Sequence, residues 1–160
     1  MEKDERLFAD IVKRHKSAIY AVCYMFAKEA EEAEDLFQEV LINLWKGMDS
    51  FREESKIDTW IWRVSFNTCI SADRKRRRRK SVRLSMDVNL YDTHDEDSRQ
   101  IKMLHDRIHR LKPFDRAIVM LWLEGLPYDE IGAVVGISVK NVSVRLVRIK
   151  EELKRMNNNE

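Results

Sequence analysis

The chain has 160 residues, of which 44% are hydrophobic, and it contains only 4 Gly and 2 Pro. This composition excludes wholesale disorder and a turn-rich β fold, and it predicts one or two small helical domains. The net charge of +2 hides an uneven distribution, because residues 1–58 carry 9 Lys/Arg against 14 Asp/Glu and residues 59–85 carry 9 against 1. One acidic and one basic surface predict two different partners.

The sequence carries no export or membrane signal. Its first ten residues are charged, and no apolar run approaches the roughly 20 residues of a membrane span. Cys23 and Cys69 stand alone, without the spacing of a metal site. We therefore expect a cytoplasmic protein with two reduced thiols, no metal, no cofactor and no membrane insertion.

Three helices are predicted in the first half of the chain. Apolar residues recur at helical spacing over residues 7–26 and again over residues 33–45, where the opposite face is acidic. Gly47 is the expected C-cap of the second helix. A polar loop over residues 47–58 follows, and Asp58 or Thr59 is expected to cap the third helix.

The third helix is apolar almost all the way round and runs into seven consecutive basic residues, Arg74 to Lys80. Trp60, Trp62 and Phe66 precede this basic run. Aromatic side chains beside cations suit unstacked single-stranded DNA, which gains about 1–3 kcal/mol for each stacked base. Core packing is the alternative for each aromatic side chain, and it is the preferred interpretation for Trp60.

An acidic linker is predicted over residues 84–99, because this segment is polar and lacks helical periodicity. In the second domain, an apolar stripe runs from Ile101 to Leu111 and ends at Pro113. Asp115 is the expected cap of the next helix, which Gly125 and Pro127 stop.

A helix-turn-helix is predicted over residues 128–156. Gly132 permits close approach of the partner helix, Gly136 suits a left-handed turn, and Ser138 is the expected N-cap of the second helix. The second helix has an apolar stripe for the core. The remaining face suits the major groove, and it displays Lys140, Asn141, Ser143, Val144, Arg145, Val147 and Arg148. A helical hairpin that only packs is the alternative.

Taken together, these motifs resemble the extracytoplasmic-function (ECF) type sigma factors of bacterial RNA polymerase, which belong to the sigma-70 family. The stretch at residues 33–40 with residues 44–46 resembles the helix that grips the clamp helices of the polymerase β′ subunit. Residues 59–67 resemble the helix that opens and reads the minus-ten element, and the helix-turn-helix resembles the domain that reads the minus-35 element.

The resemblance implies an all-α fold of two small helical domains joined by a flexible acidic linker. Residues 1–83 would bind polymerase core and the minus-ten element, residues 84–99 would form the linker, and residues 100–160 would read the minus-35 element. The implied partners are the β′ clamp helices and β flap of the polymerase core, promoter DNA and an anti-sigma factor. No catalytic residue is implied, so an enzyme is not expected.

The resemblance also assigns residues to each contact. The polymerase-binding residues would be Asp35, Gln38, Glu39 and Asn43. The minus-ten contacts would be Trp62, Arg63, Phe66, Asn67, Ser71, Arg74, Arg76 and Arg77, with the loop at residues 51–56 shaping a pocket for a flipped base. The minus-35 contacts would be Lys140, Asn141, Ser143, Val144, Arg145 and Arg148.

Three positions depart from the family pattern. Ser71 stands where the family usually has Asp or Asn, Ser143 where a basic residue is frequent, and Val144 where a small polar residue is frequent. These departures leave open which promoter sequence the protein would read. They do not change the class of protein that the motifs resemble. Val144 suits contact with a thymine methyl group.

Two other classes of function remain open from the residues alone. A dimeric regulator with a helix-turn-helix would bind palindromic half-sites about one helical turn apart without polymerase. An adaptor protein would make no contact with nucleic acid. His105 and His109 have the i, i+4 spacing of a zinc helix, but no third ligand is evident, so solvated histidines are the preferred interpretation.

Overall fold

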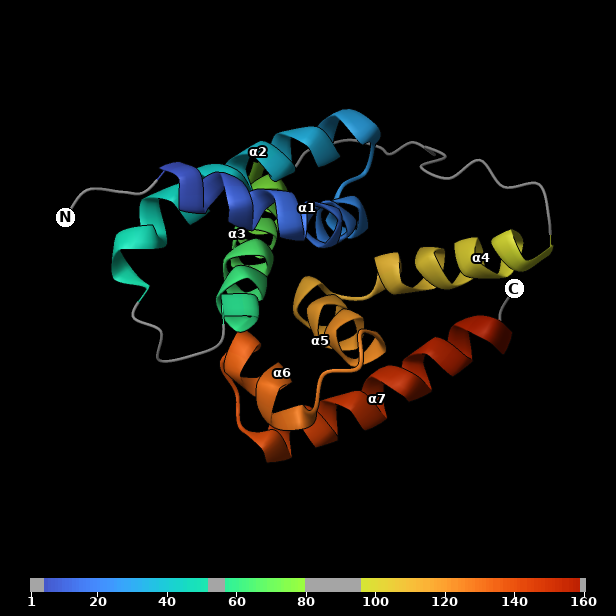
Figure 1. The fold of residues 1–160 in the computed structure, drawn as a ribbon. Coiled ribbons are helices and arrows are strands. Elements are labelled where there is room, and N and C mark those ends of the chain that lie inside the picture. Colours follow the sequence, from blue (N-terminus) through green and yellow to red (C-terminus); the bar gives the residue numbers. More distant parts are fainter. Residues whose placement is uncertain (1–4, 52–56, 80–95, 159–160) are drawn as a thin grey trace. The chain divides into compact units, whose positions relative to one another are not determined.

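The computed structural model describes residues 5–51, 57–79 and 96–158, which form seven α-helices and one short 3-10 helix and contain no strand. The all-α prediction is confirmed. The chain divides into two units, Met1–Leu90 and Tyr91–Glu160 (Figure 1). Most of the predicted linker lies outside the described residues. Its predicted end is wrong, because residues 96–99 already belong to a helix.

The N-terminal unit consists of three mutually packed helices, α1 (Glu5–Phe26), α2 (Ala30–Gly47) and α3 (Ile57–Arg79) (Figure 1). Each helix contributes one apolar stripe to a shared core. The buried side chains include Ile19, Val22, Phe26, Ala33, Leu36, Val40, Leu44, Ile61, Phe66 and Cys69. Among the described helices, none is long and apolar enough to cross a membrane.

Helix α3 buries polar as well as apolar side chains. The hydroxyls of Ser65 and Thr68 donate to the carbonyl oxygens of Ile61 and Val64, at 2.8 and 2.7 Å. These bonds to the preceding turn satisfy groups that would otherwise be costly to bury. Helix α3 can therefore lie against both α1 and α2 and still present a polar face on its outer side.

The helix ends of this unit differ from the predictions. Gly47 has helical dihedrals, and the C-cap of α2 is Met48, from which a 3-10 helix (Met48–Ser50) continues the chain. No left-handed residue is needed there, so the predicted role of Gly47 is wrong. Helix α3 begins at Ile57, which places Asp58 and Thr59 inside its first turn and not at its cap.

The C-terminal unit contains α4 (Glu96–Arg110), α5 (Pro113–Leu123), α6 (Tyr128–Val135) and α7 (Val139–Asn158). Pro113 is the first residue of α5 and Lys112 its N-cap, so the predicted capping role of Asp115 is wrong. Gly125 follows α5 with φ of 88° and donates its N–H to the Trp122 carbonyl oxygen, which confirms that this glycine ends the helix.

The turn between α6 and α7 has the predicted chemistry. Gly136 is left-handed, with φ of 83°, and the Ser138 hydroxyl oxygen accepts the Asn141 N–H at 3.1 Å. A Cβ at Gly132 would lie 2.5 Å from the Ile137 carbonyl oxygen. Gly132 therefore permits close approach as predicted, although its nearest neighbour is the turn and not the partner helix.

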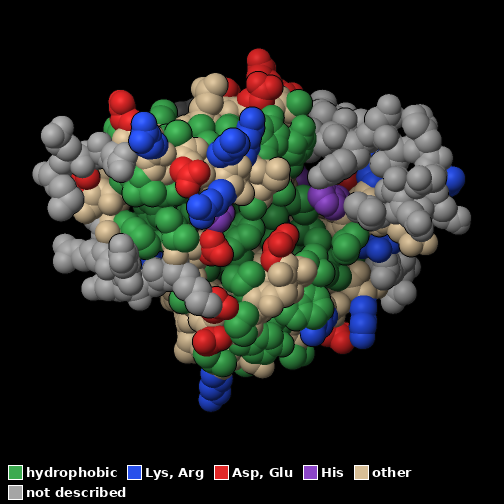
Figure 2. Space-filling view, viewed as in Figure 1, with side chains coloured by type: hydrophobic (Ala, Val, Ile, Leu, Met, Phe, Trp, Pro, Cys, Tyr) green, Lys and Arg blue, Asp and Glu red, His purple; other side chains and the backbone are tan. Residues whose placement is uncertain are grey.

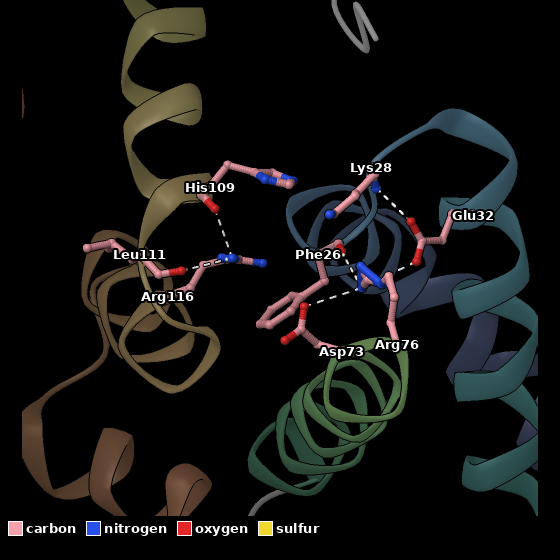
Figure 3. A network of polar contacts seen from close by, with 8 residues as sticks. All are labelled: Phe26, Lys28, Glu32, Asp73, Arg76, His109, Leu111 and Arg116. Carbon is pink, nitrogen blue, oxygen red and sulfur yellow. Dashed lines mark hydrogen bonds and ion pairs between the residues drawn. The ribbon is translucent and has the colours of Figure 1, made fainter. Parts of the chain in front are cut away.

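The corner between α4 and α5 is held by a buried arginine. Arg116 is only 4% exposed, and its guanidinium donates to the carbonyl oxygens of His109 and Leu111, both at 2.9 Å (Figure 3). A cation at the C-terminal end of a helix satisfies carbonyl groups that lack helical partners and favours the helix dipole. Arg116 thus fixes where α4 ends.

The two helical glycines provide a matched test of this packing. Gly132→Ala should destabilise the C-terminal unit by about 1–3 kcal/mol, because the new methyl group meets backbone that cannot move aside. Gly47→Ala is the control, since its Cβ would meet only the Trp60 ring at an ordinary 3.5 Å. That control should be neutral or stabilise by up to about 1 kcal/mol. Urea unfolding followed by circular dichroism measures both, and equal effects would contradict this account.

Candidate partner and nucleic-acid interfaces

The outer face of α2 carries an acidic surface, defined here as Glu31, Glu34, Asp35, Gln38, Glu39 and Ile42. All six side chains are exposed. Ile42 is an exposed large apolar residue, at 52%, one position from the predicted Asn43. An apolar side chain rimmed by carboxylates suits contact with a protein. The same carboxylates repel nucleic acid.

Asn43 lies where α2 meets α3. Its side-chain amide donates to the Thr68 hydroxyl oxygen at 2.9 Å, across the two helices. One donor of this predicted partner-binding residue is thus used inside the N-terminal unit. The bond links the acidic surface of α2 to the helix that carries the predicted nucleic-acid contacts.

The outer face of α3 carries a polar stripe, defined here as Arg63, Asn67, Ser71 and Arg74. Their spacing of four, four and three residues places them on one side of the helix. Asn67, Ser71 and Arg74 are exposed, and Arg63 is half-buried. The stripe contains no carboxylate, since the one acidic residue in this part of the helix, Asp73, is 7% exposed.

The aromatic residues of α3 have different environments. Phe66 is 1% exposed and packs edge-on against Phe26, so the prediction that it contacts DNA is wrong. It is a core residue. Trp62 is half-buried and stacks on Phe66, with ring centroids 5.9 Å apart. Trp60 packs against Phe51 at 5.0 Å, which agrees with its preferred structural role.

Arg76, a predicted DNA contact, is used inside the N-terminal unit. Its guanidinium pairs with the carboxylates of Glu32 and Asp73, both at 3.3 Å, and donates to the Phe26 carbonyl oxygen at 3.4 Å (Figure 3). These three groups come from α2, α3 and the end of α1. Arg76 therefore holds the α1–α2 turn against α3, and its predicted contact with DNA would have to compete with these pairs. The side chain of Arg77 lies outside the described residues.

Helix α7 separates a buried from an exposed face. Val142, Leu146 and Ile149 are at most 1% exposed and form the back of the helix. Of the predicted contacts, the exposed ones are Lys140, Asn141, Ser143, Val144 and Arg148. The face of the molecule drawn in Figure 2 shows hydrophobic, basic and acidic side chains over the C-terminal unit. The exposed residues of α7 combine cations with an amide, a hydroxyl and a methyl-bearing side chain, which suits the phosphates and base edges of the major groove.

Arg145 is tied to α5. Its guanidinium pairs with Asp115 at 3.0 Å and lies over the Phe114 ring, 4.8 Å from the centroid. The Arg145 side chain is still 42% exposed. Asp115, which was predicted as a cap, thus positions an arginine 30 residues away.

The two histidines of α4, His105 and His109, are half-buried and not fully solvated as predicted. No group of three or more potential ligands occurs within the described ranges 5–51, 57–79 and 96–158. Burial lowers the pKa of His105, against the opposing effect of the Asp106 carboxylate. A neutral, half-buried histidine agrees with a packing role for this side chain.

Sequence reasoning missed the contacts that four groups make, namely Glu32, Thr68, Phe114 and Asp115, the last of which it assigned only as a helix cap. Each acts on a predicted residue from a different helix. No local signal in the sequence identifies these contacts. The residues joined by the polar contacts lie between 25 and 44 positions apart in the chain.

Arg74 and Arg76 offer a matched pair for mutation. Arg76→Ala should lower the free energy of unfolding of the N-terminal unit by about 1 kcal/mol, since the ion pairs are partly screened by solvent. Arg74→Ala should leave stability unchanged and reduce the salt slope of single-strand DNA binding by about 0.7. Urea unfolding and salt-dependent fluorescence anisotropy distinguish the two. A stability loss in Arg74→Ala with none in Arg76→Ala would reverse the assignment.

Comparison with known proteins gives the same family for both units. Residues 11–79 match Sigma-70 region 2, and residues 101–153 match Sigma-70, region 4. The ECF RNA polymerase sigma factor SigW of Bacillus subtilis is 29% identical, over 95% of this chain and 89% of its own length. The RNA polymerase sigma-H factor of Pseudomonas aeruginosa is 28% identical, over 94% and 86%.

Solved structures show the same fold. The sigma factor RpoE of Bartonella quintana, in complex with the anti-sigma factor NepR, superposes with a TM-score of 0.73 at 21% identity, covering 94% of this chain and 96% of that chain. CnrH in complex with the cytosolic domain of CnrY gives 0.72 at 21% identity, covering 98% and 91%. An autonomous dimeric regulator is not favoured, because region 2 would then be unexplained. The chain therefore belongs to the sigma-70 family, and it is a sigma factor of the ECF type.

Proposed function

We propose that this sigma factor directs RNA polymerase core to its promoters with three separate surfaces. The acidic surface of α2 binds the β′ clamp helices, the polar stripe of α3 binds the opened minus-ten element, and the exposed face of α7 binds the minus-35 duplex. The observation that carries this proposal is the division of the N-terminal unit. Carboxylates occupy one exposed helix face, and a carboxylate-free polar stripe occupies another.

The Asn43–Thr68 hydrogen bond supports a coupling between the first two surfaces. Because it joins α2 to α3, polymerase held by α2 would fix the orientation of the α3 stripe. Asn43 then acts as a positioning residue in addition to any direct contact with polymerase. Such preorganisation lowers the cost of binding separated strands.

Promoter opening would depend on the α3 stripe and on Trp62. Unpairing and unstacking a base costs a few kcal/mol, which hydrogen bonds to its edge and stacking on an aromatic ring offset. Asn67 supplies an exposed amide for a base edge, and Arg63 and Arg74 supply cations for the strand. The chain itself is proposed to catalyse no covalent step. Since polymerase and promoter lie in the cytoplasm, we expect it to act there.

An anti-sigma factor is a further proposed partner. The solved structure of RpoE contains such an antagonist, and CnrH is bound to a cytosolic domain of CnrY. An antagonist of this chain would have to cover the acidic surface of α2 or the exposed face of α7 to block its proposed contacts.

Run-off transcription tests the proposed function. Purified chain added to polymerase core should produce transcripts from a subset of promoters that core alone does not start. DNA-binding assays without core should show no preference for palindromic duplexes. Failure to start any transcript from a promoter library, with a folded chain and active core, would contradict the proposal.

The acidic surface can be tested by a double substitution. Asp35→Ala with Gln38→Ala should weaken core binding about tenfold or more, because it removes a charge and a hydrogen-bonding group from the centre of the surface. Fluorescence anisotropy of labelled chain titrated with core measures the affinity. Asp106→Ala, which removes an exposed carboxylate from α4, is the matched control and should bind normally. Equal affinity of the double variant and the control would refute the role of α2.

A further inference from the structure

Val139, Val144 and Val147 of α7 are exposed. Val139 is the first residue of the helix, whereas Val144 and Val147 lie past its first turn and are not explained by packing. Val144 is 42% exposed and Val147 is 62% exposed, whereas the core positions of the helix are filled by other residues. Valine also has low helix propensity, because its branched side chain loses rotamer freedom in a helix. Neither the core nor the stability of α7 therefore accounts for them.

The surroundings of the two valines favour nucleic acid over protein as the occupant. Exposed Lys140, Asn141, Ser143 and Arg148 flank them, and the first turn of α7 contains no acidic residue. The first carboxylate of the helix is that of Glu151. A protein-binding groove would need a more continuous apolar patch, whereas isolated methyl groups among cations suit the floor of a DNA groove.

The contacts of Arg145 within the C-terminal unit bear on which side chains of α7 recognise bases. Arginine commonly reads guanine with two hydrogen bonds, but this guanidinium is held by Asp115 and lies over Phe114. Apolar side chains have one common target in the major groove, which is the C5-methyl group of thymine. The two valines are thus placed to supply base recognition beside Arg145, whose guanidinium is already paired within the unit.

We propose that Val144 and Val147 each contact a thymine methyl group in the minus-35 duplex and so determine its sequence. This inference rests on the proposed function of α7. Side chains three residues apart on a helix have Cβ atoms about 5–6 Å apart, whereas successive base pairs rise by about 3.4 Å. The two thymines are therefore expected on adjacent or next-but-one base pairs, on either strand.

Replacing thymine by uracil tests the proposal, because uracil lacks only the methyl group. A promoter is first selected by run-off transcription from a pool randomised across the minus-35 element. Each thymine in that element is then changed singly to deoxyuridine. With holoenzyme that contains the wild-type chain, the change to deoxyuridine should lower initiation about fourfold at each of two positions when DNA is limiting. This factor is the one expected for loss of one buried methyl group.

The valine variants should lose this sensitivity selectively. Holoenzyme with Val144→Ala should initiate transcription equally well with thymine or uracil at one of the two positions. Holoenzyme with Val147→Ala should do so at the other position. Both variants should fold, since alanine favours a helix and neither side chain is buried. Leu123→Ala, which removes an exposed apolar side chain from α5, is the control and should keep the wild-type ratio at both positions.

Several outcomes would overturn the inference. Normal initiation by the wild-type chain with no position sensitive to uracil would refute it and leave the proposed function intact. Uracil sensitivity that persists in both alanine variants would assign the methyl contacts to other residues. An equal loss on thymine and uracil templates in those variants would place the valines against polymerase or another protein. If no promoter is started at all, the proposed function fails, and this inference fails with it.

Discussion

The contact between α2 and α3 is the constraint on which the N-terminal unit depends. Two helices with different exposed faces lie side by side, since one carries exposed carboxylates and the other an exposed stripe without them. The apolar stripe of α2, with the buried Leu36, Val40 and Leu44, contributes to the core that this helix shares with α1 and α3. The Asn43–Thr68 hydrogen bond then fixes the register, because it forms only when the two side chains face each other.

Charge within this unit is used for structure as well as for binding. Arg76 comes from the basic part of α3, yet it pairs with two carboxylates and donates to a backbone carbonyl beside the α1–α2 turn. In the C-terminal unit, Arg145 is similarly held by Asp115 and Phe114. A basic residue in a binding segment is therefore not by itself a DNA contact. The geometry of its nearest carboxylate decides which role it has.

The sequence predicted the elements better than the contacts between them. Helical periodicity located α1 to α7, and local turn chemistry predicted Gly125, Gly136 and Ser138 correctly. Caps at the other helix ends were mispredicted because Gly47 and Asp115 have acceptable cap chemistry but lie inside helices. Phe66 was misplaced because α3 is apolar on nearly every side, so its sequence does not identify which aromatic faces the core. Apart from the i, i+3 pair of Arg76 with Asp73, the polar contacts of Arg76 and Arg145 join residues far apart in the chain and have no periodic signal.

The central claim is that the α3 stripe holds opened DNA, whereas a separate surface on α2 holds polymerase. A fluorescent adenine analogue in the minus-ten element reports unstacking directly when holoenzyme opens a promoter. With Asn67→Ala, which removes an exposed amide from the stripe, we predict normal assembly with core and at least tenfold slower fluorescence gain. An unchanged rate of fluorescence gain, with assembly also unchanged, would contradict the account.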